Sequence, residues 1–346
     1  MDTNATADAA AKWIGWWLIA LGLMVYAMIL VGGATRLTDS GLSITEWDPI
    51  SGFLPPLSEA AWDAEFEKYK QTAEYRLQNR GMSEGEFRYI FWWEWAHRFF
   101  GRLVGLVAIA GFVVFWRRGW LNPPLARRLA IIIGLGGLQG FIGWWMVASG
   151  IGDTDRTDVA PYRLATHFGL ALLILALIAW TWLDLNGRRE DGPVEQGPRR
   201  AAYALLGLTA IQMLAGALVA GHDAGRTYTD WPLMAGEFAP SGYWAEAGGL
   251  RNLVENVAAV QFNHRILAYA LWAGALAALF AFRRHALRDG FALIATLITL
   301  QSAWGVLTLM NAAPLGLALV HQGLGVICLL AAVHLSWRAR PQPLPA

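Results

Sequence analysis

The chain has 346 residues, of which 56% are hydrophobic and only 15% charged, whereas an average soluble protein carries roughly 25% charged residues. This composition, together with a single cysteine, excludes a disordered chain, a disulfide-built secreted module and a typical soluble enzyme. The net charge of +1 argues against a nucleic-acid partner. What remains is a protein that crosses a lipid bilayer several times, in which 7 histidines need an explanation.

Eight segments are apolar over the length of about 20 residues that a membrane-crossing helix needs. Their runs are long and rich in leucine and alanine rather than alternating, so helices are expected and strands are not. The first run is too long for a cleaved signal peptide. We therefore predict an all-α polytopic membrane protein with spans near 13–34, 93–116, 128–149, 163–185, 201–221, 259–282, 290–310 and 316–337.

Arginines gather in alternate connections between these spans. Basic residues in short loops mark the cytoplasmic side, so both termini are expected in the cytoplasm. The residues concerned are Arg117, Arg118, Arg127, Arg128, Arg188, Arg189, Arg199, Arg200, Arg283, Arg284, Arg288, Arg338 and Arg340.

Two longer loops, 35–92 and 222–258, fall on the opposite side. Aromatic residues at helical spacing predict a short amphipathic helix after Ser58 in the first loop. Ser83 and Glu86 form a capping-box pattern, which predicts that the second span begins near residue 84.

The two halves of the chain resemble each other, span for span. The matched histidines are His97 and His167 in the first half and His264 and His321 in the second. Because each half has four spans, the repeat has the same topology in both halves. We predict two pseudo-symmetric four-helix bundles, residues 1–186 and 201–346, joined by a cytoplasmic linker at 187–200.

These four histidines are the strongest functional candidates, because polar residues inside spans are costly and usually mark function. One pair in each bundle, at similar depth, suits ligation of a haem iron by two imidazoles. Interhelical hydrogen bonds are the alternative. Zinc is less attractive because the expected further ligands are missing. The remaining histidines, His222, His285 and His334, are expected at surfaces or interfaces.

Four charged residues accompany the histidines. Arg98, Arg102 and Arg265 are candidates for pairing with haem propionates, the alternative being arginines that extend to the membrane surface. Glu94 lies three residues before His97, on the same helix face, and Gln261 takes its place in the second half. Because an acid lies beside only one of the two sites, we expect the two sites to have different tasks. The alternative is that Glu94 merely pairs with Arg98.

The sequence resembles the haem A synthase family over nearly its whole length. The resemblance rests on GGATRLTDSGLSITEW at 32–47, FWWEWAHR at 91–98 and GRTYTDWPLM at 225–234, with the runs around His264 and His321. It implies oxidation of the C8 methyl group of haem O to a formyl group, which gives haem A for terminal oxidases.

The same resemblance assigns roles to the candidate residues. It implies substrate haem O at His97 and His167, a b-type haem for electron transfer at His264 and His321, and a catalytic role for Glu94. Cysteine pairs found in the outer loops of some members are missing, so the chain resembles the cysteine-free branch of proteobacteria and mitochondria.

The resemblance also implies a setting. The short N-terminus lacks an Arg-rich transit peptide, which favours a bacterial cytoplasmic (inner) membrane with haem sites toward the periplasm. Expected partners are haem O synthase and an electron acceptor that the sequence does not identify. Glycine-rich spans permit a homo-oligomer.

Two other functions stay open on the residues alone. A quinol-linked, two-haem b-type electron carrier would also use histidine pairs, although four histidines near one side do not suit an electron path across the membrane. A haem transporter would call for spans broken near mid-membrane, for which Gly134–Gly137 is a weak hint.

Overall fold

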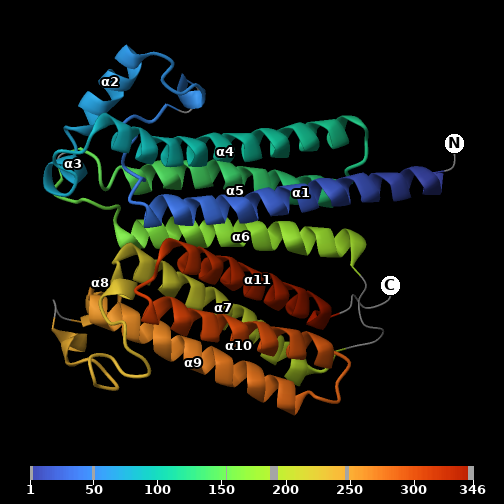
Figure 1. Cartoon of the computed structure of the whole chain (residues 1–346). Coiled ribbons are helices and arrows are strands. Elements are labelled where there is room, and N and C mark those ends of the chain that lie inside the picture. The colour runs from blue at the N-terminus through green and yellow to red at the C-terminus, as the bar shows by residue number, and fades with distance from the viewer. Residues whose placement is uncertain (1–2, 49–50, 153, 188–193, 246–248, 342–346) are drawn as a thin grey trace. The chain divides into compact units, whose positions relative to one another are not determined.

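The computed structural model describes residues 3–48, 51–152, 154–187, 194–245 and 249–341 (Figure 1). Regular structure in these ranges is helical, apart from one isolated bridge between Met234 and Glu237. The predicted all-α class is confirmed.

Eight helices of the described residues are long and apolar enough to cross a bilayer, as predicted. They are α1 (Thr3–Leu37), α4 (Glu84–Arg117), α5 (Pro123–Val147), α6 (Pro161–Asn186), α7 (Gln196–Gly221), α9 (Val257–Ala281), α10 (Arg288–Met310) and α11 (Leu315–Ala339). Of the arginines that set the orientation, Arg188 and Arg189 lie outside the described residues.

Several helix starts follow directly from local sequence. The predicted capping box begins α4, because Ser83 and Glu86 bond each other's backbone N–H groups. Asn122 caps α5 ahead of a proline in the first turn, and Asn256 caps α9.

The loop between α1 and α4 contains η1 (Ser51–Phe53), α2 (Glu59–Tyr69) and α3 (Ala73–Leu77). Ser58 caps α2, and its side chain accepts a hydrogen bond from the Ala61 N–H at 3.2 Å. The aromatic face of α2 is buried against the start of α4, which confirms the predicted amphipathic helix. The buried members of this cluster are Trp62, Phe66, Tyr69, Phe87, Ile90 and Phe91.

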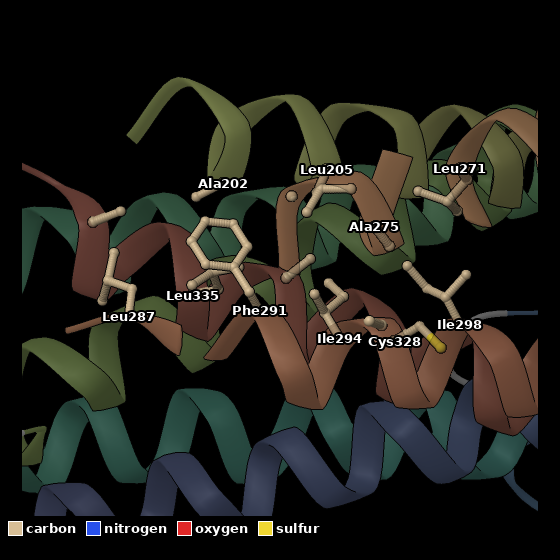
Figure 2. Close-up of a cluster of buried hydrophobic side chains, with 14 residues drawn as sticks. Ala202, Leu205, Leu271, Ala275, Leu287, Phe291, Ile294, Ile298, Cys328 and Leu335 are labelled. Carbon is tan, nitrogen blue, oxygen red and sulfur yellow. The ribbon is translucent and has the colours of Figure 1, made fainter. Parts of the chain in front are cut away.

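The chain divides into two compact units, residues 24–171 and residues 1–23 with 172–346. In the second of these, α7 packs on α9, α9 on α10, α10 on α11 and α11 on α7, which makes a closed four-helix arrangement. Its core contains Phe291, Ile294 and Leu335, all fully or almost fully buried (Figure 2).

The loop between α7 and α9 carries η2 (Ala224–Arg226), η3 (Ser241–Trp244), η4 (Gly249–Arg251) and α8 (Asn252–Glu255). The unit boundaries fall within α1 and α6. The division into bundles at 1–186 and 201–346 stays a prediction.

Candidate functional site

Glu94 is buried, with 2% of its surface exposed, one helical turn before His97 on α4. Its Oε2 accepts hydrogen bonds from Ser43 Oγ at 2.7 Å and from the Ile44 N–H at 2.8 Å. Its Oε1 accepts two from the Arg98 guanidinium, at 3.0 and 2.6 Å. Charge-assisted bonds of this kind are strong, so the carboxylate is held in one position.

Arg98 also fixes the loop between α1 and α4 to helix α4. Its two terminal nitrogens donate to the carbonyl oxygens of Ile44 and Glu46, both at 2.8 Å. One turn later on α4, Arg102 donates to the Asp48 carbonyl at 2.6 Å. The arginines predicted to pair with propionates therefore bind backbone carbonyls of one loop segment, and their contact with a propionate stays a prediction.

The second half repeats this arrangement with a neutral group. Gln261, at the position that corresponds to Glu94, donates to the Tyr228 carbonyl at 2.8 Å. Arg265 donates to the carbonyls of Tyr228, Asp230 and Leu233 at 2.9 to 3.0 Å. The loop between α7 and α9 therefore meets an amide donor, whereas the loop between α1 and α4 meets a carboxylate acceptor.

Each of the four candidate histidines stands against a glycine of a neighbouring helix. A methyl group built on that glycine would lie 2.7 to 3.2 Å from an atom of the imidazole ring, closer than most such groups pack, so the ring would have to shift. The four contacts are Gly32 with His97, Gly143 with His167, Gly216 with His264 and Gly305 with His321.

Three of these histidines also meet a glutamine. The sequence matches Gln139 and Gln301 as repeat positions, but it did not predict their contact with histidines. The Gln139 amide nitrogen lies 3.2 Å from His167 Nδ1 and donates to the His167 carbonyl at 3.0 Å. Gln212 meets His264 in the same way, at 3.1 Å for each contact.

Gln301 repeats the contact with His321, at 3.2 Å to Nδ1 and 2.9 Å to the carbonyl oxygen. In the sequence, each of the three glutamines stands four residues before the glycine that touches the same histidine. This Gln-x-x-x-Gly spacing on neighbouring helices was the available signal.

The donor set fits a haem iron, which takes two axial ligands from a protein. His97 and His167 lie within electrostatic range of each other, as do His264 and His321. Within the described residues, no group of three or more His, Cys, Asp or Glu is placed to hold a metal ion. The candidate ligands for a metal in this chain are therefore pairs of imidazoles, each packed against a glycine.

The other histidines are engaged elsewhere. His222 lies 2.8 Å from the Val254 carbonyl, His285 accepts from the Leu287 N–H, and His334 stacks on Trp337. Cys328 is a buried free thiol.

The fold and the site define a class: helical membrane proteins that cross the bilayer several times and carry repeated pairs of half-buried histidines. The chain belongs to the COX15-CtaA family, described as cytochrome oxidase assembly proteins, whose model matches residues 15–333.

Relatives are similar over nearly the full length of both chains. A protein of Hyphomonas neptunium named "Heme A synthase" is 62% identical, covering 98% of this chain and 96% of its own. Proteins of the same name from a Bradyrhizobium species and from Caulobacter vibrioides are 48% and 49% identical. They cover 99% and 94% of this chain, and 94% and 95% of their own chains.

Proposed function

We propose that this protein is a haem A synthase, an oxidoreductase that converts the C8 methyl group of haem O to a formyl group and so supplies haem A to terminal oxidases. The observation that carries the proposal is the 62% identity, over nearly the whole chain, to a relative of that name. The two histidine pairs and the single buried carboxylate beside one of them support it.

We assign the substrate to the first half, with His97 and His167 as iron ligands. Both rings lie against glycines, so the neighbouring helices leave the space that the imidazoles themselves occupy. The adjacent Glu94 is the feature that separates this pair from the other, and substrate chemistry is what would use it.

Glu94 supplies a fixed negative charge beside the substrate. Withdrawal of electrons from the methyl group leaves positive character on that carbon and releases protons, and a pre-oriented carboxylate stabilises such a state. Ser43 Oγ donates to this carboxylate at 2.7 Å, so a proton that reaches Glu94 meets a hydroxyl able to exchange it. The two hydrogen bonds from Arg98 hold the carboxylate in position between these events.

We assign a resident haem b to the second half, with His264 and His321 as its ligands. When bound, this group supplies one-electron transfer. Gln261 presents an uncharged amide where the first half has Glu94, and Arg265 fixes the covering loop through three carbonyls.

The setting follows from the basic loops. We place the chain in a bacterial cytoplasmic membrane with both termini in the cytoplasm and both haem sites toward the periplasm. The proposed partners are a haem O synthase, which supplies the substrate, and an electron acceptor. We also propose that the protein forms a homo-oligomer.

The direct test is to express the chain with a haem O synthase, purify it and identify the extracted haems by chromatography and mass. Haem A is the expected product. A folded, haem-loaded protein that yields haem O and no haem A would overturn the proposal, and two unmodified haems that both cycle in redox titration would favour the electron carrier.

Glu94→Gln and Gln261→Ala form a matched pair for this assay. Glu94→Gln is expected to keep haem but to lower formyl formation about 100-fold or more, a loss typical of a missing acid–base group. Gln261→Ala, at the corresponding place in the second half, should keep most of the product yield. Equal yields from Glu94→Gln and the unchanged protein would remove Glu94 from the reaction.

A further inference from the structure

Three of the four histidines contact a glutamine, and at the corresponding position near His97 the sequence has a methionine instead. Gln212 stands four residues before Gly216, and Met28 stands four residues before Gly32 at the corresponding place in the first half. The register is secure, because Asp39 and Asp223 follow these two glycines at equal spacing, both with φ of 49°.

The amide geometry suits control of an imidazole. Each amide nitrogen lies 3.1 to 3.2 Å from Nδ1 of its histidine. The amide oxygens, Oε1 of Gln139, Gln212 and Gln301, are buried without a hydrogen-bond partner. A buried acceptor that lacks a partner costs roughly as much free energy as a lost hydrogen bond. Each of these amide oxygens is therefore available to a further hydrogen-bond donor.

Ligation of iron by the histidine supplies such a donor. A histidine that binds iron through Nε2 carries its proton on Nδ1, and the partner of this proton orients the ring and raises its basicity. A partial rotation of each glutamine amide about its Cγ–Cδ bond brings Oε1 to Nδ1–H, while the amide nitrogen keeps its hydrogen bond to the histidine carbonyl. The unpartnered Oε1 can then accept from Nδ1–H at the position where the structure shows contact.

Met28 offers His97 no such partner. A thioether is at most a weak acceptor, and the Met28 methyl reaches toward Gly101, with Cε 3.4 Å from a methyl group built there. His97 is therefore held by packing against Gly32, whereas the other three rings have an amide as well.

We propose that Gln139, Gln212 and Gln301 are positioning residues that fix three of the four iron ligands, and that Met28 leaves His97 as the exchangeable one. This inference rests on the proposed haem ligation. A substrate haem has to leave as product, and a ligand without a fixed partner lowers the barrier to its release. A resident haem has to stay, and both of its ligands are fixed.

The test measures haem loss from the purified holoprotein to excess apomyoglobin, with the two sites distinguished by haem type in the pyridine haemochrome spectrum. Gln212→Leu and Gln301→Leu should speed loss of haem b about 10- to 100-fold, as is typical when the partner of a metal-bound histidine is removed. They should also raise the midpoint potential, because the ligand becomes less basic. Met28→Gln should slow loss of haem from the first half about tenfold and delay product release.

Thr209→Val is the matched control. Thr209 lies on α7 within one turn of Gln212, is buried, and donates to the Leu205 carbonyl of its own helix. It should change neither the rate of haem loss nor the potential.

The outcomes separate this inference from the proposed function. A folded protein that binds no haem refutes the function, and the inference with it. A haem-loaded protein in which the leucine variants keep the unchanged rate and potential overturns the inference alone. If the leucine variants do not fold, Met28→Gln decides, and an unchanged rate of haem loss in that variant overturns the inference.

Discussion

Glu74 on α3 is a buried acid that the proposed chemistry does not use, and it makes the outer loop sensitive to pH. Its side chain is 1% exposed, and its Oε2 has no hydrogen-bond partner. Burial, and then the nearby charges of Glu94, Asp158 and Asp39, raise the pKa of Glu74 from 4.5 to about 8, although a hydrogen bond with Tyr69 opposes the rise.

The raised pKa of Glu74 decides whether the loop becomes more or less stable as the pH rises. The folded carboxyl binds a proton more tightly than the same carboxyl in the opened loop, so its contribution to stability is full below pH 4.5 and is lost as the pH rises through about 8. Since each pKa unit corresponds to 1.36 kcal/mol, the free energy of opening this loop should fall by about 2–3 kcal/mol between about pH 5 and pH 7.

Hydrogen exchange of α2 and α3, corrected for the intrinsic rate at each pH, measures this opening. We expect protection in the unchanged protein to fall between these pH values, and Glu74→Gln to remove most of the fall. Glu67→Gln is the control, because Glu67 is exposed and pairs with Lys70 at the surface. A Glu74→Gln variant that keeps the original pH dependence would refute the reasoning.

Three further substitutions test the packing. Gly305→Ala places a methyl 2.7 Å from His321 Cε1, and overpacking of about 1–3 kcal/mol should weaken haem binding in the second half about tenfold in a titration; Gly207→Ala, with open space around it, should not. Phe291→Ala, in the core of Figure 2, should cost about 3–5 kcal/mol, and an unchanged melting temperature would contradict this. Arg265→Ala should ease opening of the loop at Tyr228–Leu233 by about 2 kcal/mol or more, seen as faster limited proteolysis there.

The membrane spans could be predicted because their signal is local. Apolar runs placed seven of the eight helix starts within about five residues once the Ser83 capping box set the start of α4. The exception is α1, which begins at Thr3 rather than near residue 13. Its first turns are rich in alanine, which favours a helix without adding to a long apolar run.

The candidate iron ligands could be named from the sequence, and their ligation stays a prediction, whereas the side chains that contact them were found only in the structure. His97, His167, His264 and His321 are visible because the repeat places them in pairs. The glutamine contacts depend on how neighbouring helices pack, so the Gln-x-x-x-Gly spacing gains its meaning only once the facing histidine is known. The repeat itself also hides Gln212, because its counterpart is a methionine.

The proposed division of labour follows from what the duplication kept and what it changed. Both halves keep an arginine that fixes the outer loop, at Arg98 and Arg265. They also keep a glycine against every candidate ligand. These shared features serve any haem, whichever task it has.

The two differences discussed above both fall beside His97. One is a carboxylate in place of an amide at Glu94, and the other is a thioether in place of an amide at Met28. A centre that only passes electrons needs neither a fixed negative charge nor a loosened ligand. A centre that oxidises its haem and then releases it would use both, and for this reason we propose that the half with these two substitutions performs the chemistry.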